Sequence, residues 1–86
     1  MKLKEGFILR EVAGEYIVVP SGETLDLNMM ISLNETGKFL WEILEKGAEE
    51  EELVEALLGE YDVSREDAKA HVSAFVAKLR ENEFFN

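Results

Sequence analysis

Two groups of side chains in this sequence are of types that do chemistry, and neither predicts catalysis. His71 is the only histidine, which excludes a metal site built on two histidines. Glu49–Glu52 are four consecutive carboxylates, but consecutive residues of a helix point in different directions and do not converge on one ion. Acidic residues at the start of a helix stabilise its dipole instead. The sequence therefore predicts no catalytic residue, no metal ligand and no cofactor.

Other motifs and the charge exclude further classes. The chain has no glycine-rich phosphate-binding loop and no GxSxG nucleophile motif. Its formal net charge of −10 opposes binding to a nucleic-acid backbone.

Composition predicts one soluble domain over residues 1–86. The chain is 47% hydrophobic and lacks cysteine, which fits a reducing compartment. No apolar run approaches the roughly 20 residues of a membrane span, and the run after the first lysines is too short for a signal peptide. We expect a cytoplasmic protein with no membrane partner.

The first third of the chain is typical of β-strands. Residues 6–12 and 15–20 are rich in β-branched and aromatic side chains, and Ala13-Gly14 between them is typical of a two-residue hairpin. Pro20 has no amide donor and ends the second strand. Met29–Leu33 is a short apolar stretch that predicts a third strand.

The remainder predicts three helices. The first begins after Asn34 as N-cap, or at a capping box formed by Ser32 and Glu35, and ends at Gly47. The second covers about residues 49–61. The third begins at Ser64 and carries apolar residues at positions 68, 72, 75 and 79.

This order predicts the α+β class: a three-stranded antiparallel β-meander followed by three helices that cover one face. Gly37 is expected to let the first helix pack closely, and Trp41 to lie in the core. Phe84 and Phe85 are expected to fold back on that core. A three-stranded meander has two edge strands with unpaired backbone groups, and proteins either cover such edges or use them to pair with another chain.

Three stretches together resemble the PqqD-like family. They are Leu33-Asn34-Glu35-Thr36-Gly37 followed by Leu40-Trp41, the hairpin at residues 7–20, and residues 60–85. The similarity runs from about Gly6 to Phe85, and the ending Asn82–Phe85 replaces the Gly-Leu type that is usual in the family. The resemblance implies a winged helix-turn-helix-like fold.

The resemblance also implies a function. Members of this family are RiPP recognition elements, non-catalytic chaperones that bind the leader segment of a ribosomally made precursor peptide. They present it to a modifying enzyme, often a radical SAM protein. The leader adds as a strand beside the third strand and lies against the third helix.

We expect peptide contacts from the third strand and from one flank of the third helix. The strand residues are Met29, Met30, Ile31 and Ser32, with Ile31 supplying an edge amide. Of the two flanks, we prefer the one in which an apolar residue lies between two cations: Lys69, Ser73, Val76 and Arg80. The other flank carries His71 and Lys78.

Two alternatives remain open from the residues alone. The architecture is shared with winged-helix DNA-binding domains, although Glu66 and Asp67 place acid where a recognition helix contacts DNA. In the second alternative, the edge strands of two copies of the chain pair with each other, and the protein is a structural homodimer. We expect a leader-binding monomer or homodimer that does not bind nucleic acid.

Overall fold

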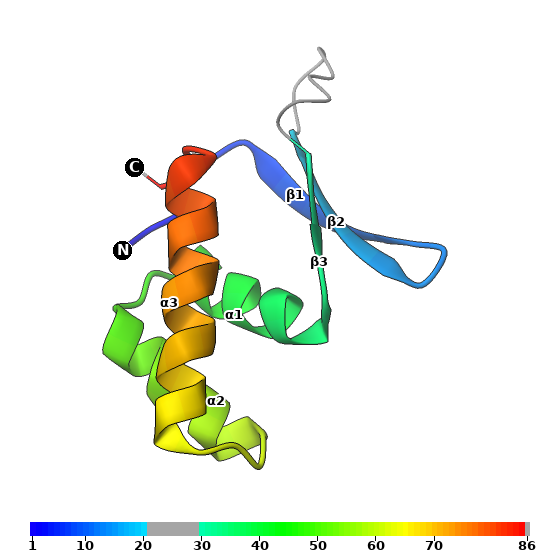
Figure 1. Cartoon of the computed structure of the whole chain (residues 1–86). Coiled ribbons are helices and arrows are strands. Elements are labelled where there is room, and N and C mark those ends of the chain that lie inside the picture. Colours follow the sequence, from blue (N-terminus) through cyan, green and yellow to red (C-terminus); the bar gives the residue numbers. More distant parts are fainter. Residues whose placement is uncertain (21–29, 86) are drawn as a thin grey trace.

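The computed structural model describes residues 1–20 and 30–85. Figure 1 shows a small antiparallel sheet beside three helices. The elements are β1 (Phe7–Val12), β2 (Glu15–Pro20), β3 (Ile31–Leu33), α1 (Glu35–Glu45), α2 (Glu50–Glu60) and α3 (Arg65–Glu81). The sheet order is β1-β2-β3, so the predicted α+β meander is confirmed. Met29 lies outside the described residues.

The hairpin between β1 and β2 has the predicted two-residue turn. Ala13 and Gly14 have φ angles of 53° and 83°, both in the left-handed region. A turn with positive φ at both central positions has the twist that antiparallel strands require. It sets Val12 opposite Glu15 and fixes the register of the whole pair, from Phe7 opposite Pro20 onward.

The core lies where the three helices meet one face of the sheet. Trp41 is only 1% exposed, which confirms its expected place in the core. The centroid of its ring lies 5.6 Å from that of Phe84 in an edge-to-face arrangement, and the ring centroid of Phe7 lies 4.6 Å from that of Phe84. The Trp41 indole N–H has no hydrogen-bond partner among the described residues.

The two ends of the chain lie together beside α3 (Figure 1). The Lys4 amide donates to the Phe84 carbonyl at 2.8 Å, and Leu3 forms a β-bridge with Phe85. Phe84 is fully buried, so the expectation that it folds back on the core is confirmed.

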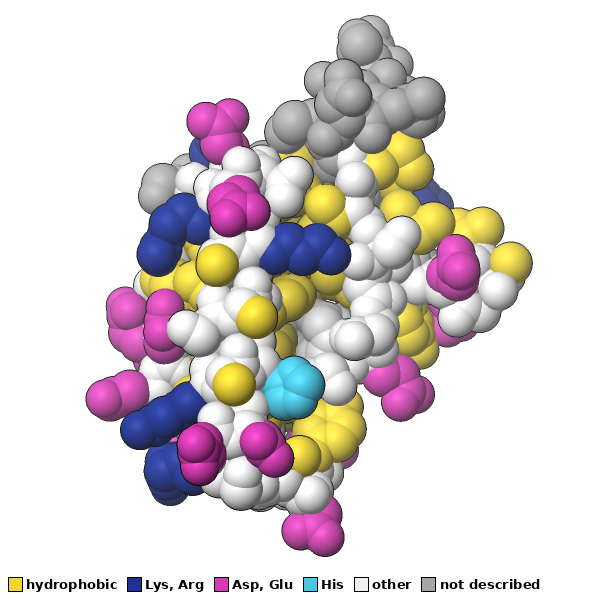
Figure 2. Space-filling model, viewed as in Figure 1, with side chains coloured by type: hydrophobic (Ala, Val, Ile, Leu, Met, Phe, Trp, Pro, Cys, Tyr) yellow, Lys and Arg dark blue, Asp and Glu magenta, His cyan; other side chains and the backbone are white. Residues whose placement is uncertain are grey.

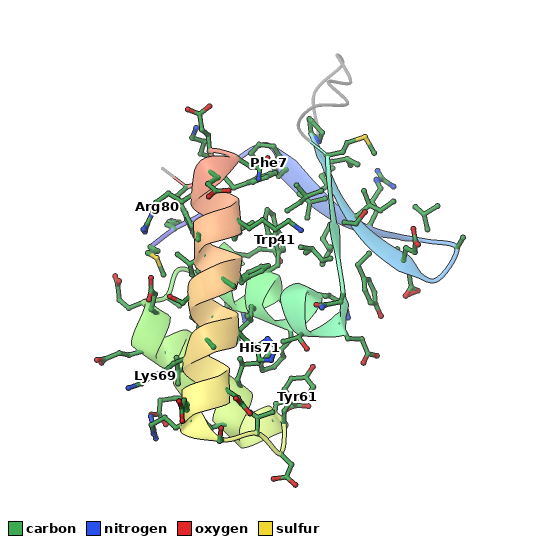
Figure 3. All side chains as sticks on the ribbon, in the orientation of Figure 1. Phe7, Trp41, Tyr61, Lys69, His71 and Arg80 are labelled. Atoms are coloured by element: carbon green, nitrogen blue, oxygen red, sulfur yellow. The ribbon has the colours of Figure 1, made fainter. Side chains whose placement is uncertain are left out.

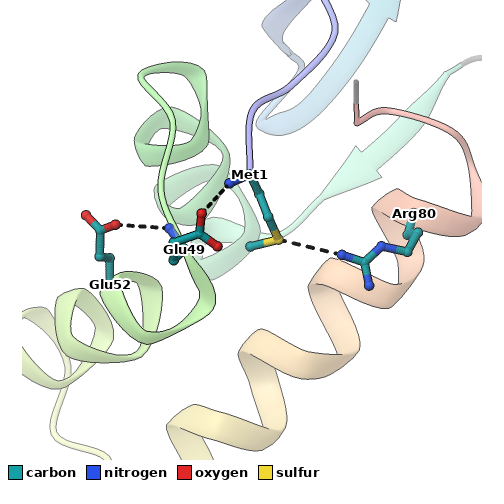
Figure 4. Close-up of polar contacts among 4 residues, drawn as sticks. All are labelled: Met1, Glu49, Glu52 and Arg80. Atoms are coloured by element: carbon teal, nitrogen blue, oxygen red, sulfur yellow. Dashed lines mark hydrogen bonds and ion pairs between the residues drawn. The ribbon is translucent and has the colours of Figure 1, made fainter.

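The acidic run at residues 49–52 begins α2, as predicted. The Glu49 amide donates to the Glu52 carboxylate at 3.1 Å, and the amino group of Met1 donates to the Glu49 carboxylate at 3.0 Å (Figure 4). These carboxylates satisfy donors at a helix start and at the chain terminus.

Asn34 is the N-cap of α1, which decides between the two predicted caps. Its side-chain oxygen accepts a hydrogen bond from the Gly37 amide at 2.7 Å. Gly37 is buried, and a Cβ there would lie 3.2 Å from the Asn34 side-chain oxygen and 3.3 Å from the Leu33 Cβ. The glycine therefore allows α1 to approach the end of β3 closely, as expected.

Replacing Gly37 with alanine is expected to lower the free energy of unfolding by about 1 kcal/mol. Crowding the Asn34 cap and Leu33 outweighs the helix propensity that alanine gains. Thermal unfolding would then show a melting temperature lower by about 5 °C. Gly59→Ala is the matched control because a Cβ there meets nothing within 4 Å. It should raise the melting temperature, and a rise for both variants would contradict the crowding argument.

Candidate functional site

The hydrogen-bond pattern of the sheet identifies which residue of β3 presents its backbone to the open edge. A two-residue hairpin turn is closed by a hydrogen bond between the residues that flank it, so Val12 and Glu15, which are partners across the turn, are assigned as a hydrogen-bonded pair. Such pairs alternate along antiparallel strands. On β2, the backbone groups of Glu15, Ile17 and Val19 therefore face β1, and those of Tyr16 and Val18 face β3.

The same alternation continues across β3. Tyr16 lies opposite Leu33 and Val18 opposite Ile31, so the backbones of Leu33 and Ile31 bond to β2. Ser32 lies opposite Ile17 in a non-bonded pair, and its N–H and C=O face away from β2. No further strand pairs with β3 in the described part of the chain. The open edge is therefore the backbone of Ser32.

The expectation that Ile31 supplies the edge amide is wrong. Its N–H faces β2, and its side chain is 9% exposed, within the core. The strand alternates as a half-buried strand does, with Ile31 and Leu33 buried and Ser32 exposed. Ser32 keeps its predicted place at the edge, and Met30, which directly precedes β3, is half-buried.

A groove separates this edge from α3. We call it the β3–α3 groove; it encloses about 270 Å³ and is lined by Ser32, Leu33, Asn34, Gly37, Ala74, Phe75 and Lys78. The Lys78 ammonium donates to the Ser32 carbonyl at 3.4 Å, so it spans the groove. Figure 2 shows yellow hydrophobic atoms between α3 and the sheet and a dark blue basic side chain that crosses them.

The flank of α3 that faces β3 is the one that the sequence prediction set aside. Figure 3 shows His71 on the side of α3 nearer to β3, and Lys69 and Arg80 on the opposite side. Lys69 and Ser73 line a separate cavity against α2. Arg80 contacts the Met1 sulfur at 3.7 Å (Figure 4). The prediction that these three residues face the β3 edge is therefore wrong.

Val76 requires a further correction. It is 1% exposed and belongs to the core with Ala68, Val72 and Leu79, whereas Phe75 is half-buried at the groove. Phe75 and Val76 are adjacent and both apolar, so the sequence permits the buried stripe to include either. Packing against the other helices selects Val76, and this turns Phe75 and Lys78 toward β3.

The cavity between α2 and α3 is larger, at about 480 Å³, but has a different character. It is lined by Glu50, Glu51, Val54, Glu55, Arg65, Lys69, Val72 and Ser73. Arg65 donates to the Glu55 carboxylate at 2.6 Å, and this hydrogen bond raises the pKa of the guanidinium further. Both walls are helices, whose backbone groups bond internally. This cavity therefore presents no strand edge.

The chemistry of the β3–α3 groove is suited to binding an extended peptide. Its described lining contains one cation, one amide side chain and one hydroxyl, together with the apolar side chains of Leu33, Ala74 and Phe75. In the described part of the chain, no three His, Cys, Asp or Glu side chains gather as a metal site. Nor is any described helix long and apolar enough to cross a membrane. An open strand edge beside apolar side chains binds extended peptides: the backbone supplies hydrogen bonds and the side chains supply selectivity.

Two solved structures share the fold over nearly its whole length. The structure described as "TbiB1 in Complex with the TbiA(beta) Leader Peptide" superposes with a TM-score of 0.76 at 25% sequence identity, covering 98% of this chain and 93% of that one. "Lasso peptide synthetase B1 complexed with the leader peptide" gives 0.72 at 22% identity, covering 94% and 91%. No curated protein matches the chain.

The family comparison agrees with the resemblance noted in the sequence. The profile described as "Coenzyme PQQ synthesis protein D (PqqD)" matches residues 7–84, from the start of β1 to the buried Phe84. This range includes β3, α3 and the groove between them. The chain therefore belongs to the PqqD family.

Proposed function

We infer that this protein is a non-catalytic module that binds the leader segment of a ribosomally synthesised precursor peptide. The leader adds as a fourth strand, pairing with the N–H and C=O of Ser32, and its side chains lie over Phe75 and Ala74. The observation that carries this proposal is the open backbone of Ser32 beside the β3–α3 groove. The TbiB1 structure, which has the same fold and holds a leader peptide, supports it.

Presentation to an enzyme completes the proposed role. The bound leader holds the rest of the precursor near a modifying enzyme, such as a radical SAM protein, which supplies the chemistry. The complex forms in the cytoplasm, where the precursor is made. Membership of the PqqD family does not by itself assign the product, which depends on the precursor and on the enzyme.

A DNA-binding role has less support. Glu66 and Asp67 are exposed in the first turn of α3, the end that contacts bases in helix-turn-helix proteins. The Lys78 ammonium on α3 donates to a carbonyl of the protein's own β3. The net charge of −10 opposes binding to the phosphate backbone of duplex DNA.

An NMR titration tests the proposal directly. Isotope-labelled protein is titrated with the leader of a precursor encoded beside its gene, and in parallel with duplex DNA. We expect saturable shifts centred on Ser32, Gly37, Phe75 and Lys78 with the leader, and no saturable shifts with DNA. If the leader shifted only the resonances of residues that line the cavity between α2 and α3, the binding site would lie in that cavity and strand addition would be contradicted. Saturable, salt-dependent shifts with DNA alone would overturn the proposal in favour of the winged-helix alternative.

A further inference from the structure

We propose that Lys78 makes the protein selective for leaders that carry a carboxylate side chain in the β3–α3 groove. This inference rests on the proposed function and names the chemistry of the peptide. Before binding, the Lys78 ammonium is held by the Ser32 carbonyl; after binding, it is held by an aspartate or glutamate of the leader.

The exchange follows from the geometry of the free protein. The Ser32 carbonyl that accepts from Lys78 at 3.4 Å is the acceptor that an added strand requires. A leader amide that pairs with this carbonyl competes with the ammonium for it. The same contact places a lysine along an open strand edge, a device that discourages pairing with other strands.

A displaced Lys78 needs a new acceptor. Once a strand covers the groove, the ammonium is partly removed from water, and an unpaired cation there is unfavourable. The other described lining residues include no carboxylate. A carboxylate on the leader is the partner that restores a charge-assisted hydrogen bond.

The strand geometry also places this carboxylate within the leader. Side chains of a strand alternate between faces, so the leader residues on the face of Ile31 and Leu33 point toward α3. Phe75 and Lys78 are three residues apart on α3, on the same side of the helix. We therefore expect an apolar leader residue over Phe75 and an acidic one near Lys78, two positions apart.

The negative net charge of the protein limits how many carboxylates a favoured leader can carry. The net charge of −10 repels acidic peptides at a distance, but that field is screened beyond about 8 Å in physiological salt. The pair with Lys78 forms at contact distance, where screening is weak. The favoured leader therefore carries one carboxylate in the groove rather than an acidic run.

A random peptide library tests the inference without the natural leader. Phage-displayed peptides about fifteen residues long are selected on immobilised wild-type protein and on the Lys78→Glu and Lys69→Glu variants. Lys69 is the matched control, since it is also exposed on α3 but lies against α2. Wild-type and Lys69→Glu selections should both enrich one Asp or Glu two positions from an apolar residue. The Lys78→Glu selection should lose this enrichment of Asp or Glu and should enrich Lys or Arg at the same position of the peptide.

Individual peptides then give the size of the effect. Removing the carboxylate from a selected peptide should weaken binding to wild type about tenfold, and should change binding to Lys78→Met by less than about twofold. Equal acid enrichment on wild type and Lys78→Glu would overturn the inference, and so would loss of enrichment on Lys69→Glu.

The failure of this inference is distinguishable from failure of the proposed function. Selected peptides that lose binding when Ser32 is replaced by proline, yet show no acid preference, would leave strand addition intact and reject the role of Lys78. Selected peptides that are indifferent to Ser32→Pro would reject strand addition and the Lys78 inference together.

Discussion

A variant in which proline replaces Ser32 is expected to stay folded and to bind the leader at least about thirtyfold more weakly. The Ser32 amide faces the open edge, so its removal breaks no bond within the sheet. In the complex, however, a leader carbonyl loses its donor and is left unpaired, which costs about 2 kcal/mol or more. Fluorescence anisotropy with a labelled leader measures the affinity, and circular dichroism measures the fold.

Two further variants test whether the backbone of Ser32 is responsible. Ser32→Ala keeps the N–H and loses only an exposed hydroxyl, so its affinity should stay within about twofold of wild type. Ile31→Pro removes a bond to β2 and a buried side chain, so it should lower the melting temperature sharply. A stable Ile31→Pro variant together with an unstable Ser32→Pro variant would show that the assignment of the edge is reversed.

Replacing Phe84 with alanine is expected to lower the free energy of unfolding by about 3–5 kcal/mol. Phe84 is fully buried, and its ring contacts those of Phe7 and Trp41, which come from β1 and α1. A domain of 86 residues has a total stability of about 4–13 kcal/mol, so this single change removes a large part of it. Urea denaturation followed by Trp41 fluorescence measures the loss.

The neighbouring aromatic residue is the matched control. Phe85 is half-buried and lies under the Arg80 guanidinium, whose central carbon is 5.9 Å from the ring centroid. Phe85→Ala should cost about 1 kcal/mol, because the ring is partly in water already. Equal losses for the two variants would contradict the view that Phe84 alone anchors the chain end in the core.

Local chemistry explains why much of the fold was predictable from the sequence. Ala13-Gly14 accepts the positive φ angles that the hairpin turn needs, and Asn34 and Ser64 cap the helices that follow them. Each of these features depends on neighbouring residues in the chain, so it can be recognised without the tertiary structure. The same holds for Gly37, whose close neighbours are Leu33 and Asn34.

The candidate site was only half predictable, for a definite physical reason. The third strand was recognised as the edge, but its open amide belongs to Ser32 rather than Ile31. A shift of one residue in the pairing of β2 and β3 exchanges the bonded and open positions. That register depends on packing of Ile31 and Leu33 into the core, which no local pattern encodes.

The orientation of α3 likewise depended on the tertiary structure. Each residue turns the helix by about 100°, so choosing Val76 rather than Phe75 for the core decides which flank faces β3. Both flanks carry cations, so charge did not distinguish them. The sequence by itself therefore determined the elements, their order and the family. Only the packing of the helices on the sheet decided that Ser32, Phe75 and Lys78 meet at one groove.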